Sequence, residues 1–218
     1  MLLISTENNA LESRKNRLLA ALPDCEYERL IPHLKPVELT FEKVLIEPEE
    51  TITDVYFPYK AVVSLITIME SGFSVEVGIV SNEGMVGIPI ILGGNQSTTK
   101  AIVQVPDSGW QMKADVLKSE FDRGGVLQNI LLRYFQTLYT QVSQGAACNR
   151  LHTLEQRLAR WLLTVSDGME SDDFPLTQEF IAQMLGVRRS GVTVAAKTLS
   201  QEGWELIRNI YPYLLITT

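Results

Sequence analysis

The sequence predicts an α+β protein built from a region of short antiparallel strands, one long helix and a C-terminal helix-turn-helix. Between about residues 37 and 121, β-branched runs such as VYFP and FSVEVGIV alternate with turn signals, a pattern typical of a sandwich or barrel. From about 126 to 149, apolar residues recur at steps of three and four, which indicates a helix. Residues 178–197, QEFIAQMLGVRRSGVTVAAK, have the spacing of two helices joined by a tight turn.

Length and composition indicate an ordinary globular protein. The chain has 218 residues, of which 45% are hydrophobic, enough to bury a sizeable core. No stretch approaches the ~18 uninterrupted apolar residues that a membrane helix requires, and the N-terminus lacks a signal-peptide pattern. Cys25 and Cys148 are the only cysteines, which favours a reducing compartment over a disulfide framework. The sequence therefore predicts a cytoplasmic protein with no membrane partner.

Three segments are expected to fold as units. Residues 1–125 hold the strands, preceded at 10–34 by helical segments that Pro23 and Pro32 interrupt. Residues 126–151 form the long helix and a hinge, and residues 152–218 form the helix-turn-helix domain. In the unusually apolar stretch 203–218, Pro212 removes a hydrogen-bond donor from any strand formed there.

The long helix has two apolar stripes. Leu127, Ile130 and Tyr134 form one, and it is expected to face the strand domain. The second is a heptad-like seam, expected to pack against the same helix of a second subunit and so to make the protein a homodimer. Its predicted dimer contacts are Leu131, Phe135, Leu138 and Val142. The alternative is that both stripes are buried within one chain.

Three positions of the helix-turn-helix segment carry residue types that this motif requires for physical reasons. Ala182 is small where the second helix crosses, Gly186 suits the left-handed conformation at the end of the first helix, and Val192 anchors the second. Arg188 and Arg189 open the second helix, where guanidinium groups can contact guanine edges or phosphates. The sequence favours DNA binding over an ordinary helical hairpin with solvated arginines.

The net charge of −7 does not exclude DNA as a partner. From Arg150 onward there are seven basic and eight acidic residues, so the C-terminal part is close to neutral. Affinity for phosphate depends on the local potential and the contacts made. The charge therefore predicts weak non-specific binding.

The order of these parts resembles the Crp–Fnr family of bacterial transcription regulators over nearly the whole chain. The resemblance is strongest over 157–203, which includes LTQEFIAQMLGVRRSGVTVAAKTLSQEG. It implies a jelly-roll β-barrel of the cyclic-nucleotide-binding type, a long dimerisation helix, a hinge near 149–153 and a winged helix-turn-helix. It also implies a homodimer on double-stranded DNA, with RNA polymerase as a further partner.

The resemblance assigns DNA-reading roles to matching positions. Thr177 matches the phosphate-contacting threonine of the family, and Arg189 matches its base-reading arginine. Ser190 replaces a common glutamate, and Val194 replaces the second reading arginine, so a different target sequence is expected. The residues expected to face DNA are Thr177, Gln178, Arg188, Arg189, Ser190, Thr193 and Lys197.

The resemblance also implies where an effector would bind. Family members that bind cyclic nucleotides use a glutamate for the ribose and an arginine for the phosphate; those positions are Ile88 and Thr98 here. Neither can replace the charged group, and Lys100 supplies only a point charge. The sequence predicts a degenerate pocket that does not bind cyclic AMP and leaves the effector unidentified. Its residues are Gly87, Ile88, Thr98, Thr99 and Lys100.

Residue counts argue against catalytic and metal chemistry. Two cysteines are too few for a four-thiolate iron–sulfur cluster, and His33 and His152 are too few for a metal enzyme on the barrel. No catalytic motif is present, so no cofactor, metal site or catalytic residue is predicted. Glu70 and Glu76 are interpreted as solvated strand positions.

Two other functions stay open at this point. A dimerising partner that antagonises or scaffolds related regulators without binding DNA fits the acidic charge, Val194 and the apolar C-terminus. A small-molecule enzyme on the barrel fits less well, because a catalytic constellation is missing. A DNA-binding transcription regulator is the leading hypothesis.

Overall fold

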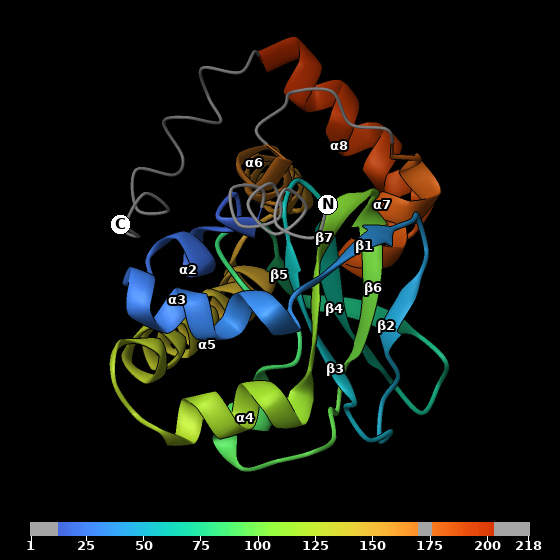
Figure 1. The fold of residues 1–218 in the computed structure, drawn as a ribbon. Coiled ribbons are helices and arrows are strands. Elements are labelled where there is room, and N and C mark those ends of the chain that lie inside the picture. The colour runs from blue at the N-terminus through green and yellow to red at the C-terminus, as the bar shows by residue number, and fades with distance from the viewer. Residues whose placement is uncertain (1–12, 170–175, 203–218) are drawn as a thin grey trace.

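The computed structural model describes residues 13–169 and 176–202 (Figure 1). The described chain opens with the helices α2 (Arg17–Ala20) and α3 (Asp24–Leu30) and the 3-10 turn η1 (Ile31–His33). Pro23 immediately precedes α3, and Pro32 lies in η1. The predicted interruptions of the N-terminal helical segment are therefore confirmed. The wing expected at 203–218, with Pro212, lies outside the described residues.

The strands of the described residues form two antiparallel sheets. They are β1 (Lys35–Leu39), β2 (Val44–Ile46), β3 (Asp54–Pro58), β4 (Val62–Ile68), β5 (Ser74–Val80), β6 (Lys100–Val105) and β7 (Asp107–Lys113). One sheet has the order β1-β7-β3 and the other β2-β6-β4-β5, and every pairing is antiparallel. The α+β class and the antiparallel strand region are confirmed.

The two sheets do not close into a barrel, which refines the predicted architecture. The consecutive strands β6 and β7 lie in different sheets, and the chain passes between them through Pro106, which has no N–H to donate. The turn expected at 106–109 is shorter than predicted, because β7 already begins at Asp107, which pairs with Leu39 of β1.

Helix α4 (Ala114–Asp122) follows β7 directly. The expectation of strands as far as residue 121 is therefore wrong from 114 onward. Ala114, Leu117 and Phe121 are buried on one face of α4, a helical spacing of three and four. The N–H of Ala114 donates to the carbonyl of Thr53 at 3.0 Å, which ties the start of the helix to the neighbouring strand.

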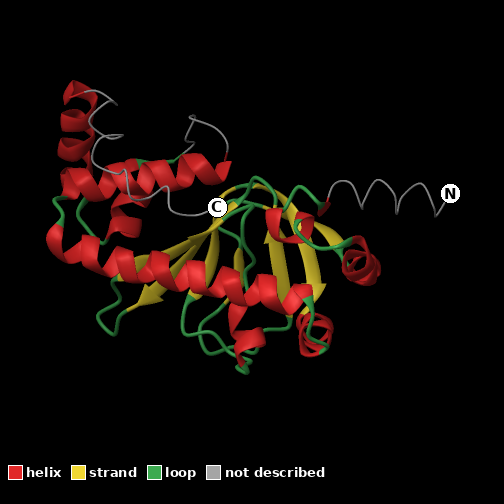
Figure 2. Ribbon diagram, turned by 90° about the vertical axis from the view of Figure 1, so that its left-hand side faces the viewer, coloured by secondary structure: helices red, strands yellow, loops and turns green. Residues whose placement is uncertain are grey.

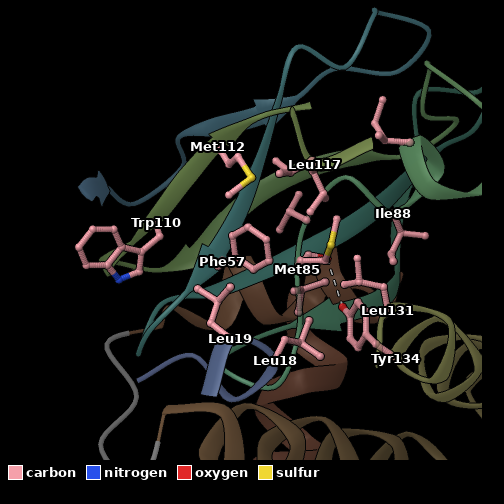
Figure 3. Packing of buried hydrophobic residues seen from close by; sticks show 14 of the residues in the cluster. Leu18, Leu19, Phe57, Met85, Ile88, Trp110, Met112, Leu117, Leu131 and Tyr134 are labelled. Carbon is pink, nitrogen blue, oxygen red and sulfur yellow. Dashed lines mark hydrogen bonds between the residues drawn. The ribbon is translucent and has the colours of Figure 1, made fainter. Parts of the chain in front are cut away.

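A first hydrophobic core fills the space between the two sheets and the helices α2 to α5 (Figure 3). Phe57 and Met112 come from the three-stranded sheet, and Leu117 comes from α4. Tyr134 reaches in from α5 (Val126–Leu151), and its hydroxyl donates to the carbonyl of Met85 at 3.3 Å. The buried phenol is thereby hydrogen-bonded, as a buried polar group requires.

The long helix α5 runs beside the strands (Figure 2). Glu26 of α3 caps its N-terminus, accepting hydrogen bonds from the N–H groups of Val126 at 2.9 Å and Leu127 at 2.7 Å. These bonds lower the pKa of Glu26, and its negative charge also complements the helix dipole. The carboxylate therefore fixes where α5 begins.

The helix break falls within the segment where a hinge is expected. Helix α5 ends at Leu151 and α6 (Leu154–Met169) begins after His152 and Thr153. The N–H of Thr153 donates to Gln156 Oε1 at 3.1 Å, and the N–H of Gln156 donates to Thr153 Oγ1 at 3.5 Å. This reciprocal pair is a capping box, which starts the new helix.

A second hydrophobic core joins the outer face of the four-stranded sheet to α6, α7 (Gln178–Leu185) and α8 (Arg189–Glu202). Val62 and Ile66 of β4 and Ile79 of β5 belong to the same cluster as Leu158 and Val165 of α6. The C-terminal helices therefore pack on the strand region. No helix in the described part of the chain is long and apolar enough to cross a membrane.

Candidate nucleic-acid interface

Helices α7 and α8 form a helix-turn-helix with a defined start and turn. Thr177 caps α7, with its Oγ1 accepting from the N–H of Phe180 at 3.2 Å. Gly186 ends the helix at φ 64° and ψ 40°, and the N–H of Val187 donates back to the carbonyl of Ala182 at 2.9 Å. This arrangement satisfies the last carbonyls of α7 and reverses the chain, as predicted for Gly186.

The two helices contact through the small and β-branched positions of the segment. Ala182 of α7 and Val192 and Ala195 of α8 are all buried in the second core. A larger residue at 182 would push α8 away, because the interior of a protein is close-packed. The direction of α8 relative to α7 is therefore set by these contacts.

Most of the residues expected to face DNA lie in or just before the first turns of α7 and α8, and Lys197 lies further along α8. All seven are exposed: Thr177, Gln178, Arg188, Arg189, Ser190, Thr193 and Lys197. Thr193 Oγ1 donates to Gln178 Oε1 at 2.7 Å, which links the two ends. Among the described residues, no carboxylate forms an ion pair with either arginine. Their guanidinium groups are therefore available to a ligand.

The helix-turn-helix is held on the sheet by polar as well as apolar contacts. Trp161 Nε1 of α6 donates to Glu76 Oε1 of β5 at 2.8 Å, and Gln183 Nε2 of α7 donates to Ser74 Oγ at 3.1 Å. The interpretation of Glu76 as a solvated strand position is wrong. The residue is partly exposed as a whole, but its Oε2 atom is buried, because α6 covers the carboxyl group.

Comparisons with known proteins agree with this geometry. Residues 156–215 match the model of the Crp-like helix-turn-helix domain. FixK2 from Bradyrhizobium japonicum has a similar structure, with a TM-score of 0.70 and 13% identity over 81% of this chain and 96% of that chain. A CRP-family transcriptional regulator from Thermus thermophilus gives a TM-score of 0.64 and 15% identity over 81% and 95% of the two chains. The chain therefore contains a match to a Crp-like helix-turn-helix domain, and its fold is that of solved Crp–Fnr regulators.

A further similar structure is that of the c-di-GMP responsive global regulator CLP of Xanthomonas campestris. It shares 13% identity over 83% of this chain and 93% of that chain, with a TM-score of 0.67. No curated protein matches the chain in sequence. The fold of the chain is one that these solved transcription regulators share. Within the described residues, no cluster of His, Cys, Asp and Glu side chains could hold a metal ion.

The residues expected to form the effector pocket lie in two segments. Gly87 precedes the 3-10 helix η2 (Ile88–Leu92) at φ 109°, and a Cβ there would lie 2.8 Å from Val55 Cγ1. Ile88 is buried in the first core. At the start of β6, Lys100 Nζ forms a salt bridge of 3.2 Å with Glu47 Oε1. The positive charge of Lys100 is therefore already paired.

Of the two threonines predicted for the same pocket, one forms a hydrogen bond to a near neighbour in the sequence and the other is exposed. The N–H of Thr99 donates to Ser97 Oγ at 3.1 Å, while Thr98 is exposed. In the part of the chain that the structure describes, no hydrogen bond or ion pair joins Thr98, Thr99 or Lys100 to Gly87 or Ile88. The structure thus places the predicted residues at the starts of η2 and β6 without a hydrogen bond or ion pair between the two groups.

Three of the four predicted dimer contacts, Leu131, Leu138 and Val142, lie on the side of α5 that faces its own chain, and the fourth, Phe135, is half-buried beside them. Leu131 and Leu138 are buried in the first core, and Phe135 packs partly against it. Val142 Cγ2 lies 3.6 Å from the position that a Cβ on Gly78 of β5 would take. The exposed apolar residues of α5 include Leu132 and Tyr139, whose exposed fractions are 42% and 65%. Sequence spacing alone did not separate these two faces.

Proposed function

We propose that this protein is a homodimeric transcription regulator that reads double-stranded DNA with helix α8. The observation that carries the proposal is that Arg188 and Arg189 are exposed at the start of the second helix and form no ion pair among the described residues. In a helix-turn-helix, this end of the second helix enters the major groove. Arginine there can hold guanine by two hydrogen bonds.

Selection of bound duplexes from a random library tests the proposal. Wild-type protein is expected to enrich a two-fold symmetric site with half-sites about one helical turn apart. Arg189→Ala should bind that site roughly 1–3 kcal/mol more weakly, whereas Arg133→Ala, which changes an exposed arginine of α5, should not. No enrichment by a folded dimer would contradict the proposal and favour the partner protein that does not read DNA.

The dimer is proposed to form through α5, as the heptad-like spacing of that helix suggests. Leu131 and Leu138 are buried within one chain, so the contacts between the two subunits are assigned to other residues of α5. These are exposed Leu132 and Tyr139 and half-buried Phe135, which form an outer apolar stripe on the helix. The rings of Phe135 and Tyr139 lie 6.4 Å apart between centroids, so they present a joint aromatic surface. Such a surface, which the described residues leave uncovered on a long helix, is suited to a second copy of itself.

Two charge substitutions on α5 separate the faces of the helix. Tyr139→Asp should convert the dimer to a monomer in light scattering, because a carboxylate would be placed in an apolar interface. Thr137→Asp, on an exposed position away from that stripe, should leave the mass unchanged. A dimer that survives Tyr139→Asp would show that α5 does not form the interface.

The regulator is further proposed to act in the cytoplasm without responding to cyclic AMP. Ile88 is buried at the position of the ribose-binding glutamate, and Lys100 is already paired with Glu47. Binding a cyclic phosphate would require breaking that pair without a bidentate replacement. Calorimetry should detect no binding of cyclic AMP, and micromolar binding would overturn this part of the proposal.

A further inference from the structure

A cavity of about 140 Å³ lies between the four-stranded sheet and the helices α5, α6 and α7. Its walls come from Val75–Ile79 of β5, the part of α5 between Gln141 and Asn149, the part of α6 between Arg157 and Thr164, and the end of α7. Ala146 is exposed and belongs to the wall, so the cavity opens along α5. The predicted effector residues on η2 and β6 do not line it.

Two glycines inside regular elements line this cavity, Gly78 in β5 and Gly145 in α5. Glycine is unfavourable in the interior of both strands and helices. A Cβ on Gly78 would make only ordinary contacts, at 3.6 Å or more. Among the described residues outside its own helix, a Cβ on Gly145 would have only Arg160 Nη2 as a close neighbour, at 3.8 Å. Packing therefore requires glycine at neither position, and the two residues leave space between β5 and α5.

The charged groups around the cavity are engaged with the protein itself. Arg157 Nε donates to Asn149 Oδ1 at 3.1 Å, and its Nη2 donates to a carbonyl at the end of α7. Glu76 Oε1 accepts from Trp161 Nε1 at 2.8 Å, and the charge of Arg160 acts on the same carboxyl group. A charged ligand would lose its hydration without gaining an uncommitted ionic partner, which is costly. The site therefore favours an uncharged molecule.

The size of the cavity and its apolar side chains narrow the class of ligand. Val75 of β5, Val142 of α5 and Met184 of α7 are among the residues that line it. An engineered cavity of about 150 Å³ with apolar walls binds benzene, so the volume here fits one molecule of that size. Sites for drug-sized ligands have ~300–1,000 Å³, which excludes a nucleotide.

We propose that this cavity binds one small, uncharged, apolar molecule of about the size of benzene, in the space that Gly78 and Gly145 leave between β5 and α5. The walls belong to the sheet, to the long helix and to the helix-turn-helix domain. A bound molecule would therefore stabilise the arrangement in which these parts are packed together, relative to every state that lacks the site.

Titration calorimetry of the full chain with benzene tests the proposal. Wild-type protein is expected to bind benzene saturably, with one molecule per chain. Gly145→Leu, which fills the cavity from α5, should raise the Kd at least roughly tenfold, and Gly145→Ala should cause a smaller loss. Thr137→Leu adds the same side chain at an exposed position of α5 outside the cavity, so it should bind like wild type. Circular dichroism establishes that each variant is folded.

Thermal unfolding without ligand tests whether the space beside Gly145 is real. Gly145→Ala should raise the Tm by roughly 2–4 °C, because alanine is a much better helix former than glycine and its methyl group would meet no atom closer than Arg160 Nη2. A lower Tm would show that other atoms already occupy this space, and would overturn the proposal.

Three substituted benzenes test the preference for an uncharged ligand. Toluene should bind wild type about as well as benzene, whereas benzoate and benzylamine, which are charged, should each bind at least roughly tenfold more weakly. The proposal is overturned if neither benzene nor toluene binds, if Gly145→Leu binds as well as wild type, or if a charged analogue binds equally well. These experiments contain no DNA, and the proposal goes beyond DNA reading, so their failure leaves the DNA-binding regulator standing.

Discussion

Replacing Glu76 by glutamine should make the stability of the protein less dependent on pH. In the wild type, the carboxyl group is buried under α6, and burial raises its pKa from the ordinary 4.5 to about 7. Glutamine is nearly the same size, stays neutral, and keeps an oxygen to accept from Trp161 Nε1. The substitution therefore removes the cost of a buried charge and retains the docking hydrogen bond.

The magnitude follows from the raised pKa. Because the folded state holds the proton more tightly than the unfolded state, the contribution of Glu76 to stability is fully present below about pH 4.5 and is lost as pH rises through about 7. One unit of pKa difference corresponds to about 1.4 kcal/mol. The wild type should therefore lose about 3 kcal/mol from this group, to the order of magnitude, between these two pH values.

Urea unfolding at about pH 4.5 and about pH 8 measures this difference directly. Glu76→Gln and wild type should have nearly equal stability at the lower pH, and the variant should be more stable at the higher pH by about 3 kcal/mol. Glu70→Gln, at an exposed position of the β4–β5 turn, should show no such pH-dependent gap. A gap that is constant with pH, or a variant less stable at about pH 8, would show that Glu76 is ionised and paired in the folded protein.

Three further substitutions test the packing around α5 and α2. Glu26→Gln should cost about 1 kcal/mol in thermal unfolding by weakening the cap of α5, and the loss should fade as pH falls through the lowered pKa of Glu26. Asn16→Ala should cost roughly 2–4 kcal/mol in urea unfolding, because four buried backbone groups lose their partner. Gly84→Ala should cost about 1–3 kcal/mol, because its Cβ would lie 2.4 Å from Tyr134 Oη, and Tyr134→Phe should recover part of that loss in the double variant.

Local patterns in the sequence predicted the helix-turn-helix well. The glycine at 186 is in the left-handed conformation, as predicted, because this feature depends on neighbours within a few residues. The strand segments were equally readable from their β-branched runs and turns. Helix α4 was missed although Ala114, Leu117 and Phe121 have helical spacing, since it follows β7 without a separating turn.

Contacts between segments that are far apart in the sequence were harder to predict from it. Closure of the barrel depends on which strands pair, and Pro106 moves the chain from one sheet to the other. The packing of α6 on β4 had one signal in the sequence. The segment VVSLI at 62–66 is almost continuously apolar, as is typical of strands that are buried on both faces. Glu76 lies on the neighbouring strand, and its burial follows from that docking rather than from any local pattern.

The docked position of the helix-turn-helix bears on how the proposed dimer would read DNA. The seven residues expected to face DNA are all exposed while α7 packs on β5, so docking does not cover them. What docking fixes is the direction of α8 relative to α5. In a two-fold dimer through α5, that direction sets the distance between the two recognition helices and hence the spacing of half-sites that can be bound together.

Weakening the contact between α6 and the sheet should therefore reduce the preference for one distance between half-sites before it weakens binding to a single half-site. Trp161→Phe keeps the ring in the second core but removes the N–H that donates to Glu76. Gel-shift titrations with the selected site and with versions that carry one or two inserted base pairs should show smaller differences in affinity for the variant than for wild type. An unchanged penalty for the insertions, in a folded dimer, would mean that the sheet contact does not orient α8.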